Sequence, residues 1–450
     1  MAYKVALVSL GCPKNLVDSE IMLGLLEREG FALVGERAEA DAIIVNTCAF
    51  IGDAREEAVT AILEAGLFKT EGRARVLAVA GCMAERYKDE IIKEMPEVDV
   101  VLGTGSIQAV ASILKSHLDE ETPPSIYCNL PESVEYLDNA RKITDNKPYA
   151  YLKIAEGCDN HCTYCVIPKL RGRYKSRSIE SVVREAAYLA DNGKPELVLV
   201  AQDVTRYGMD WAGEKKLVSL IRELSALEGV KRIRLLYCYP ELIDDALILE
   251  LAQNPKLAPY LDIPIQHISN AMLKAMGRRG TGEAIVSLLE TLREKVPGIT
   301  LRTSLITGFP GETEEDFNQM VAFVEKGYFQ NLGVFAYSRE EDTPAYRMKG
   351  QIPKRVKASR RKKLMAVQRE NVEKYNNSRR GKIYDTMVDG VADDGIFYVG
   401  RTVMEAPEID PVIYFTSPEP LETGSLVPVK MLCTDQYDLV GEAQIVLGEL

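Results

Sequence analysis

The 450-residue sequence lacks the features of several protein classes. It has no apolar run near the roughly 20 residues that a helix needs to cross a bilayer. Its first residues lead directly into a strand-like segment, without the charged and apolar regions of a signal peptide. It also has no excess of positive charge, since 55 Lys and Arg stand against 67 Asp and Glu. We therefore expect a cytoplasmic, multidomain protein, and not a membrane protein, a secreted disulfide scaffold, a disordered chain or a generic nucleic-acid binder.

Nine cysteines are present, an odd number. In a long cytoplasmic chain they favour metal or redox chemistry over disulfides. Six of them fall into two patterns that are described below. Cys128, Cys238 and Cys433 have no comparable setting, and we expect them not to be ligands.

The first ~125 residues alternate strand-like apolar runs with segments of helical periodicity. Repeated βα units imply a parallel sheet with helices on its faces. We expect this α/β domain to span residues 1–125. Residues 118–148 are polar and contain four prolines, which predicts a linker or an edge hairpin. The expected strands of this domain are 5–10, 42–45, 75–80 and 98–102.

From Tyr149 onward, a second βα series predicts a central domain over 145–375. Its six βα units fit a partial (β/α)6 barrel. We expect the active site at the carboxyl ends of the barrel strands. Residues 354–380 form a basic helix with eleven Lys and Arg against two Glu. After Gly381, five short strands predict a small antiparallel β-barrel over 381–450, with a net charge of −10. The expected central strands are 151–155, 196–201, 232–237, 261–265, 300–306 and 332–337.

The first strand of the central domain is followed by Cys158, Cys162 and Cys165, spaced C-x3-C-x2-C. Three thiolates in one loop can hold three irons of a 4Fe-4S cluster and leave the fourth iron open, and no fourth cysteine lies nearby. The alternative is a zinc site with His161 as the fourth ligand. The spacing resembles the radical S-adenosylmethionine (SAM) superfamily, with Tyr164 in its aromatic position. The resemblance implies that the open iron binds SAM, which is then cleaved to a 5′-deoxyadenosyl radical.

Polar residues follow other strands of the predicted barrel and would lie at the same active face. The segment Gly308-Phe309-Pro310-Gly311-Glu312 resembles the glycine-rich SAM-contacting segment of the superfamily. His267 taken alone fits a hydrogen-bonded structural histidine at least as well. The candidate cofactor-binding residues are Tyr164, Gln202, Asp203, Gln266, His267, Gly308 and Glu312.

A second set, Cys12, Cys48 and Cys82, is spaced by one βα unit per cysteine. Each cysteine follows a predicted strand and precedes a predicted helix, so all three would open on one edge of a parallel sheet. The spacing therefore predicts a second three-thiolate site. The alternative is three independent buried cysteines, because free Cys is common in protein cores.

Together, the three-cysteine domain, the C-x3-C-x2-C barrel and the small β-barrel resemble the methylthiotransferases over nearly the whole chain. The last module is similar to a TRAM domain, which in that family contacts the substrate. The resemblance implies two 4Fe-4S clusters, a radical-generating one on Cys158, Cys162 and Cys165 and an auxiliary one on the N-terminal cysteines. It also implies two SAM molecules, one for methylation of a cluster-bound sulfur and one for hydrogen abstraction. No catalytic residue is certain beyond the cluster-bound sites.

The family divides by substrate into tRNA adenosine modifiers and enzymes that modify the β-carbon of an aspartate in small-subunit ribosomal protein number twelve. The segment Cys12-Pro13-Lys14-Asn15 resembles the ribosomal branch, since the tRNA enzymes typically carry a Gln-Met pair after this cysteine. The acidic C-terminal barrel favours a basic protein over tRNA. The basic stretch 354–380 would suit RNA, including ribosomal RNA near the target loop, or equally a solvated helix packed beside the acidic barrel. The alternatives are a tRNA adenosine methylthiotransferase and a non-catalytic iron–sulfur scaffold.

The expected partners are that ribosomal protein or the ribosomal subunit, and an electron donor such as flavodoxin or ferredoxin. We expect neither a membrane nor direct tRNA binding.

Overall fold

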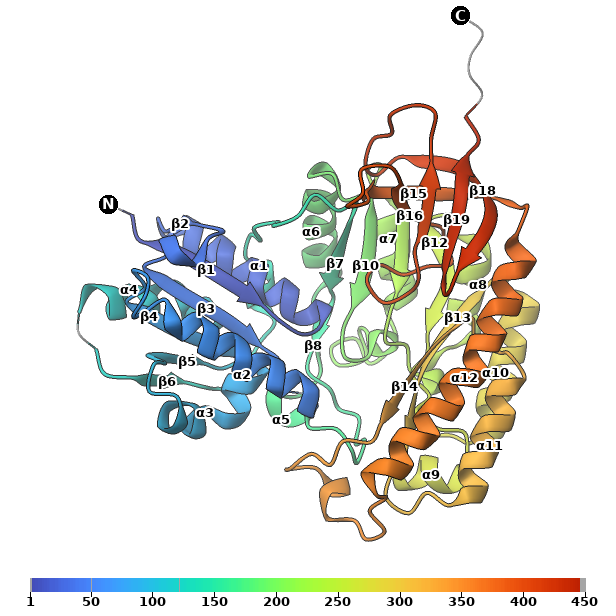
Figure 1. Ribbon diagram of the computed structural model, residues 1–450, viewed down its shortest axis with the longest axis horizontal. Coiled ribbons are helices and arrows are strands. Elements are labelled where there is room, and N and C mark those ends of the chain that lie inside the picture. The colour runs from blue at the N-terminus through green and yellow to red at the C-terminus, as the bar shows by residue number, and fades with distance from the viewer. Residues whose placement is uncertain (1, 50, 121, 446–450) are drawn as a thin grey trace, which may run out of the picture.

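The computed structural model describes residues 2–49, 51–120 and 122–445. Figure 1 shows an N-terminal sheet with its helices, a central half-barrel and a small closed barrel at the C-terminus. In these residues, no helix is both long and apolar enough to cross a membrane.

The N-terminal sheet has six parallel strands in the order β2-β1-β3-β4-β5-β6. One face packs on α1 (Pro13–Arg28) and α4 (Val110–Asp119), and the other on α2 (Gly52–Leu67) and α3 (Cys82–Glu94). Because helices cover both faces, β3 and β4 are buried along their whole length. The expected parallel α/β architecture is confirmed. The strands are β1 (Lys4–Ser9), β2 (Ala32–Leu33), β3 (Ala42–Thr47), β4 (Val76–Gly81), β5 (Val100–Leu102) and β6 (Ser125–Tyr127).

Residues 118–148 differ from the expected linker or edge hairpin. Their strand β6 pairs in parallel with β5 and forms the edge of the N-terminal sheet. Only three residues long and incompletely buried, β6 leaves no apolar run in the sequence.

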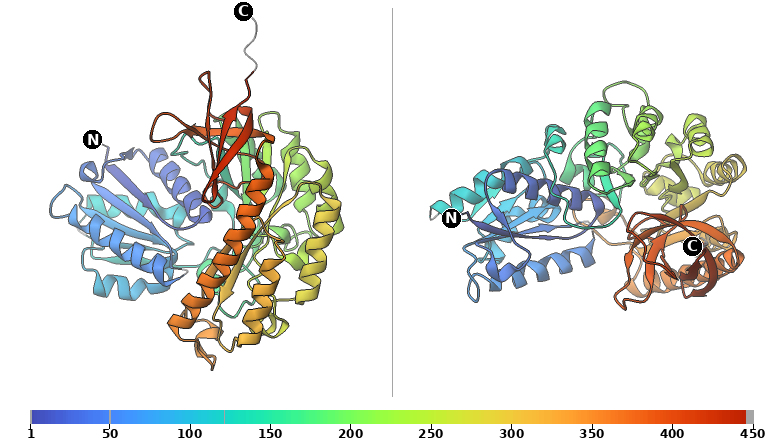
Figure 2. Two further views of the ribbon diagram at one scale, coloured as in Figure 1. Left: turned by 45° about the vertical axis from the view of Figure 1, so that its right-hand side comes forward. Right: turned by 90° about the horizontal axis from the view of Figure 1, so that it is seen from above.

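The central domain is an open sheet of six parallel strands in the order β14-β13-β12-β11-β10-β7. Figure 2 shows its helices as an arc outside the sheet. Because β7 and β14 do not pair, the expected partial barrel is confirmed. The strands are β7 (Tyr149–Lys153), β10 (Glu196–Val200), β11 (Arg232–Leu235), β12 (Leu257–Asp262), β13 (Thr300–Thr307) and β14 (Asn331–Ala336). The outer helices are α6 (Ile179–Asp191), α7 (Leu217–Ala226), α8 (Asp245–Gln253), α10 (Gly282–Lys295) and α11 (Glu314–Glu325).

Shorter elements complete this domain around the cysteine loop. The strand β8 (Ala155–Glu156) pairs with β9 (Lys175–Ser176), and α5 (Ile167–Arg171) lies between them in the chain. The short helix α9 (Asn270–Ala275) follows β12. The expected basic helix is α12 (Lys354–Arg379), which packs along β14 and α11 at the open edge.

The C-terminal strands close into a barrel in the order β15-β16-β17-β19-β18. Four of its pairs are antiparallel, but β17 and β19 run parallel, because the chain passes through β18 on the far side before it returns beside β17. The expected small barrel is confirmed with this one difference in strand direction. Its strands are β15 (Ile383–Val391), β16 (Tyr398–Arg401), β17 (Ile413–Thr416), β18 (Leu426–Asp435) and β19 (Asp438–Ala443).

This closed barrel docks at the amino ends of the central strands. Glu196, the first residue of β10, lies 3.0 Å from Arg401 of the barrel and 2.9 Å from Arg234 of β11. Burial opposes the charge of Glu196, but these arginines outweigh it and lower the pKa of Glu196 to about 2. Tyr149, the first residue of β7, donates to Glu408 at 3.0 Å. The acidic barrel therefore lies at the end of the sheet opposite to the cysteine loop.

Candidate active site

The three N-terminal cysteines lie at the carboxyl ends of three adjacent strands. Cys12 caps α1 after β1, Cys48 follows β3, and Cys82 begins α3 directly after β4. The order β1-β3-β4 places Cys48 in the middle, and neighbouring strands are about 4.8 Å apart. Cys12 and Cys82 are close enough to interact electrostatically. The structure thus brings together three residues that are 36 and 34 positions apart in the chain.

Two glycines allow this close approach. Gly11 and Gly81 precede Cys12 and Cys82, and both have φ of +90°. A Cβ at Gly11 would lie 2.6 Å from the Cβ of Cys48, and a Cβ at Gly81 would lie 2.7 Å from the carbonyl oxygen of Thr47. Only glycine fits at both positions, because any side chain would push the outer strands away from β3.

The surroundings of Cys12 favour a thiolate. Burial opposes that charge, but Lys14, Arg171 and the amides at the start of α1 outweigh it and lower the pKa of Cys12. Burial raises the pKa of Cys82, and Arg171 acts in the opposite direction. A deprotonated sulfur is the form that binds metals.

The second set lies in the loop between β8 and α5. Gly157 begins this loop with φ of +76°, and a Cβ there would lie 2.1 Å from the carbonyl oxygen of Arg173. The backbone amide of Cys158 donates to Gly172 at 3.1 Å. The side chain of Asn160 donates to Asp203 at 3.0 Å, and its backbone amide donates to the sulfur of Cys158 at 3.4 Å. The loop is therefore held from both ends and from β10.

Two side chains of the barrel face the sulfur of Cys162. The guanidinium of Arg278 donates to it at 3.9 Å, and the hydroxyl of Tyr239 lies 3.6 Å away. Arg278 also stacks over the ring of Tyr239, at 4.2 Å from its centroid. Donors of this kind stabilise thiolate sulfur and help to set the potential of an iron–sulfur cluster.

The surroundings of the Cys158 loop fit a cysteine-bound cluster better than a zinc ion that uses His161. In the described ranges, no three His, Cys, Asp or Glu side chains are arranged to hold one metal ion. Each cysteine of a 4Fe-4S cluster binds its own iron, so the sulfurs of a cluster need not meet at one point. His161, the alternative fourth ligand of a zinc site, is exposed. The N–H donors aimed at the sulfurs of Cys158 and Cys162 match cysteine-bound iron–sulfur chemistry.

One buried ion-pair network joins the two sets. Arg171, at the end of α5, donates to Asp18 at 2.7 Å, to Glu156 at 3.1 Å and to Asn15 at 3.2 Å. Lys153 lies 2.7 Å from Asp18 and also pairs with Glu156. Burial opposes the charge of Glu156, but Lys153 and Arg171 outweigh it and lower the pKa of Glu156. Because Asn15 and Asp18 belong to the helix capped by Cys12, this network fixes that helix against the Cys158 loop.

The predicted residues at the end of β10 have different surroundings. Gln202 donates to Glu156 at 3.1 Å, while its side-chain oxygen is buried without a hydrogen-bond partner. Such an atom is available to a ligand. The carboxylate of Asp203 instead accepts hydrogen bonds from Asn160 at 3.0 Å and Thr205 at 2.6 Å. Asp203 therefore positions the cysteine loop in this structure.

His267 and Glu312 are buried next to the glycine-rich turn. The Nδ1 of His267 accepts from the amides of Ile268 at 2.9 Å and Ser269 at 3.0 Å. Burial lowers the pKa of His267 to about 4, so its ring is neutral near pH 7. Glu312 accepts from the amide of Gly308 at 2.5 Å and from Arg360 at 2.7 Å. Glu312 therefore braces the turn after β13. The Nε2 of His267 is buried without a hydrogen-bond partner among the described residues and lies 4.0 Å from the Glu312 carboxylate.

The remaining candidates lie at the same face of the sheet. Gly308 has φ of +73°, and a Cβ there would lie 2.4 Å from the side chain of Lys357. Gln266 follows β12 with a left-handed backbone, at φ of +70°. Strained backbone of this kind is concentrated at functional sites. Tyr164 packs against a cluster that includes Phe309 and Tyr337, next to the same turn.

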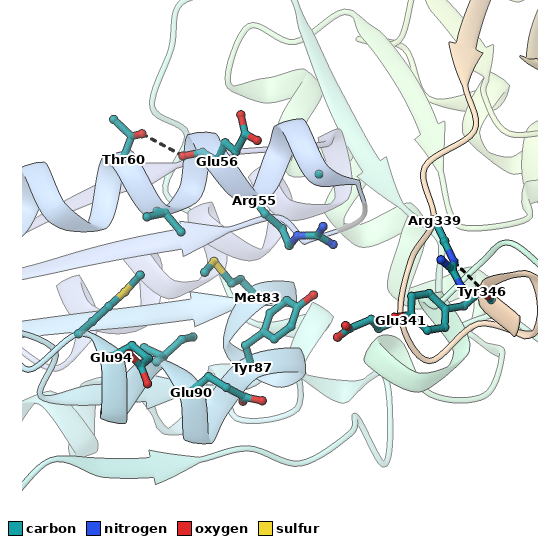
Figure 3. Close-up of a pocket in the computed structure, with 14 residues that line it drawn as sticks. Arg55, Glu56, Thr60, Met83, Tyr87, Glu90, Glu94, Arg339, Glu341 and Tyr346 are labelled. Atoms are coloured by element: carbon teal, nitrogen blue, oxygen red, sulfur yellow. Dashed lines mark hydrogen bonds between the residues drawn. The ribbon is translucent and has the colours of Figure 1, made fainter. Parts of the chain in front are cut away.

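A surface cavity of about 680 Å³ lies beside the N-terminal cysteine site. Figure 3 shows Arg55 and Tyr87 of the N-terminal domain opposite Glu341 and Tyr346 of the loop after β14. Met83, which directly follows Cys82, lines its inner side. The cavity thus marks the boundary between the N-terminal domain and the barrel, and neither cysteine set lines it.

Several residues of this site were not predicted from the sequence. Tyr239 and Arg278 carry no motif and lie far from the cysteines in the chain, which hides their contacts. Arg171 lies close to Cys165, but its partners Asp18 and Asn15 are far away in the chain. Asn160 lies inside the cysteine motif, where its amide was a visible signal. The three remaining cysteines have other surroundings: Cys433 is exposed on β18, Cys238 is buried in the segment after β11, and Cys128 donates to the carbonyl of Ala84 at 3.4 Å.

Three family models match separate parts of the chain. Residues 4–103 match uncharacterized protein family UPF0004, residues 152–324 match the radical SAM superfamily, and residues 381–443 match the TRAM domain.

Among solved structures, the fold is similar to two radical SAM enzymes. The methyltransferase TsrM from Kitasatospora setae, with cobalamin and a [4Fe-4S] cluster bound, aligns with a TM-score of 0.57 at 17% identity, covering 77% of this chain and 74% of TsrM. The cobalamin-dependent enzyme OxsB aligns with a TM-score of 0.51 at 13% identity, covering 83% of this chain and 56% of OxsB. At these identities the similarity concerns the fold alone.

Full-length relatives are much more similar. A protein of Acetivibrio thermocellus named ribosomal protein uS12 methylthiotransferase RimO is 55% identical, over 98% of both chains. The protein of that name from Lachnoclostridium phytofermentans is 48% identical, over 98% of this chain and 100% of its own length. The one from Clostridium tetani is 47% identical over 97% of both chains. At this identity and coverage, the chain belongs to the RimO family of ribosomal protein uS12 methylthiotransferases.

Proposed function

We propose that this enzyme adds a methylthio group to the β-carbon of an aspartate in ribosomal protein uS12, the small-subunit protein number twelve. The observation that carries this proposal is the pairing of two three-cysteine sets across one buried network. Sulfur delivery and hydrogen abstraction need two centres held in a fixed relation. Asp18 and Arg171 supply that relation, because each contacts the other and each belongs to a segment that carries one cysteine set.

A radical SAM enzyme uses an iron–sulfur cluster and SAM. We propose two 4Fe-4S clusters, one on Cys158, Cys162 and Cys165, and one on the N-terminal set. When bound, these groups supply the electron, the organic radical and the methylthio sulfur of the reaction. The protein supplies the arrangement, since each cysteine set has three thiols and leaves one iron without a protein ligand.

The other candidate residues orient SAM and shield the site. The buried and unpaired side-chain oxygen of Gln202 is a fitting acceptor for SAM. Gly308 leaves room for the side chain of Lys357 against the turn that we propose contacts SAM. Tyr164 and Gln266 lie at the same face and complete the proposed contact set. Asp203 holds the cysteine loop and Glu312 holds the turn, while His267 lies beside Glu312. A site closed in this way excludes water from a reactive radical.

The substrate is a basic ribosomal protein, either free or in the assembled subunit. The acidic C-terminal barrel attracts such a partner over a distance and raises the rate of encounter. We propose that the enzyme acts in the cytoplasm and receives electrons from a flavodoxin or a ferredoxin.

Anaerobic incubation with SAM, reductant and purified uS12 tests this function. We expect 5′-deoxyadenosine to form and one methylthio group to be found on an aspartate by tandem mass spectrometry. A cluster-replete sample that forms no 5′-deoxyadenosine would instead support the non-catalytic iron–sulfur scaffold.

A tRNA adenosine methylthiotransferase is the second candidate, because α12 presents a basic surface that suits RNA. Seven Lys and Arg side chains of α12 are exposed, and a basic helix is suited to a phosphate backbone. Three further basic side chains of α12 contact the protein instead of solvent. Arg360 pairs with Glu312, and Arg379 pairs with Glu405. Lys357 donates to the carbonyl of Tyr337. The same seven side chains also suit ribosomal RNA beside uS12, so the experiment with both RNAs and uS12 present decides between them. The exposed residues are Lys354, Arg355, Arg361, Lys362, Lys363, Arg369 and Lys374.

A further inference from the structure

Lys14 is a buried lysine between the two cysteine sets. It lies in the first turn of α1, two residues after Cys12, and is only 8% exposed. Its ammonium interacts electrostatically with Cys12, Tyr237 and Arg171. Burying an ammonium costs free energy unless an anion lies close to it. The position of Lys14 therefore raises the question of which anion compensates its charge.

The neighbouring ion-pair network does not supply that anion. Its two cations, Lys153 and Arg171, are balanced by its two carboxylates, Asp18 and Glu156. Over the part of the chain that the structure describes, no carboxylate lies within 4.0 Å of the Lys14 ammonium. Lys14 therefore has no carboxylate partner in this interior, and the thiolate of Cys12 is the anionic group that it faces.

Tyr237 directs Lys14 toward the barrel. The ammonium lies 3.4 Å from the centroid of the Tyr237 ring, a cation–π contact that holds the charge without neutralising it. Tyr237 follows β11 at the carboxyl end of the sheet and has a left-handed backbone, with φ of 61°. Its amide donates to Asp262 at 3.0 Å, which helps to keep this strained conformation. Lys14 thus reaches from the N-terminal domain to the strand ends of the barrel.

We propose that Lys14 binds the carboxylate of the substrate aspartate and makes the enzyme select an acidic side chain. This inference rests on the proposed function. The β-carbon of aspartate is bonded directly to the carboxylate carbon, so a cation that fixes the carboxylate also fixes the reacting C–H bond. A lysine next to Cys12 places that bond beside the cysteine set assigned to the methylthio sulfur.

The competing role for Lys14 is to compensate the charge of Cys12 and of any iron bound there. The two roles differ in what they require of the substrate. A substrate-binding lysine distinguishes aspartate from asparagine, whereas a lysine that serves only the cluster changes the cluster and leaves that preference intact.

The test compares binding of fluorescently labelled uS12 with binding of a uS12 variant that has asparagine at the modified position. Cluster-reconstituted wild-type enzyme, Lys14→Met and Lys14→Gln are titrated anaerobically. We expect wild type to prefer the aspartate form by roughly 30-fold, as for a desolvated charge pair that loses one partner. Both Lys14 variants lose this preference and bind the two forms alike. Lys142→Met, which removes an exposed lysine that pairs with Glu27, keeps the preference.

Iron and sulfide content, the reduction potential of the clusters and the thermal midpoint are measured on the same samples. Unchanged values together with a lost preference support the inference. A preference that persists in both Lys14 variants overturns it, as does a lost preference with altered cluster content or potential, which assigns Lys14 to the cluster. Mass spectrometry of uS12 after turnover by the wild type tests the proposed function separately. An unmodified uS12 in that control overturns the proposed function, and the inference with it.

Discussion

The ammonium of Lys153 lies 2.7 Å from the carboxylate of Asp18, across the boundary between the half-barrel and the N-terminal sheet. Lys153 is fully buried, and the side chain of Asp18 is 3% exposed. This contact connects a barrel strand to the helix capped by Cys12. Because this contact is buried, the fold itself fixes the position of one cysteine set relative to the other.

Replacing Asp18 is expected to destabilise the fold strongly. Asp18→Asn leaves Lys153 and Arg171 with one carboxylate between them, and an uncompensated buried charge costs roughly 3 kcal/mol or more. Urea unfolding followed by circular dichroism measures the change. The matched control is Glu39→Gln, which breaks the exposed pair of Glu39 and Lys4 and changes the free energy of unfolding by less than about 1 kcal/mol. Equal losses in both variants would show that the buried network does not stabilise the interface.

The two cysteine sets are expected to hold iron independently. Replacing Cys12, Cys48 and Cys82 together with alanine removes half of the iron and sulfide, and replacing the three cysteines of the Cys158 loop removes the other half. Cys433→Ser, an exposed cysteine on β18, leaves the iron content unchanged. Iron and sulfide analysis after anaerobic reconstitution measures this. Full iron content in either triple variant would contradict the two-cluster assignment.

Gly308 is expected to be needed for SAM binding. Gly308→Ala combines a left-handed backbone with a Cβ placed 2.4 Å from the side chain of Lys357. A strain of about 1–2 kcal/mol in this turn weakens SAM binding by roughly tenfold. Gly193→Ala has a similar φ of +78° but open space around its Cβ, so it loses some stability and keeps its SAM affinity. Isothermal titration of reconstituted enzyme with SAM separates the two, and equal affinities would remove the turn from the SAM site.

The stability contributed by His267 is expected to fall at low pH. Burial lowers the pKa of His267 to about 4 from its usual 6.5, so the unfolded chain binds more protons between these values. Stability from this group is therefore present above pH 6.5 and is lost as the pH falls toward 4. The loss between pH 7 and pH 5 amounts to roughly 2 kcal/mol.

His267→Asn isolates this effect, because an amide oxygen can accept the same two backbone hydrogen bonds but does not titrate. We compare the free energy of unfolding of wild type with that of His267→Asn. From pH 7 to pH 5, we expect the wild type to lose roughly 2 kcal/mol more than the variant. A difference that does not vary with pH would show that His267 is charged, or solvated, in the folded protein.

Much of the architecture could be predicted from the sequence, because burial on both faces leaves continuous apolar runs. The strands that carry Cys12, Cys48 and Cys82 were predicted for this reason, and so was their common edge. The edge strand Ser125–Tyr127 was not, since three incompletely buried residues give no periodicity. The parallel pairing of β17 with β19 was missed as well, because strand direction in a small barrel depends on the path of the chain and not on local pattern.

The parts of the site that depend on the spacing of cysteines in the sequence could be predicted. Both cysteine sets have a spacing that predicts their placement. The structure places one set at the ends of three adjacent strands and the other in one loop, and whether they bind clusters stays a prediction. The ion-pair network was not predictable, since Arg171 and Asp18 are 153 residues apart and meet only across a domain boundary. Asp203 and His267 were predicted as cofactor contacts. The structure shows the Asp203 carboxylate bonded to Asn160 and the Nδ1 of His267 bonded to backbone amides, while the Nε2 of His267 has no hydrogen-bond partner among the described residues. Whether they also touch SAM stays a prediction.

A competition experiment tests the central claim most directly. Reconstituted enzyme is mixed anaerobically with SAM, reductant, small ribosomal subunits and unmodified tRNA. Mass spectrometry then measures methylthio groups in uS12 and in the tRNA. The account predicts a methylthio group on one aspartate of uS12 and none on tRNA. Methylthioadenosine in the tRNA with unmodified uS12 would contradict it.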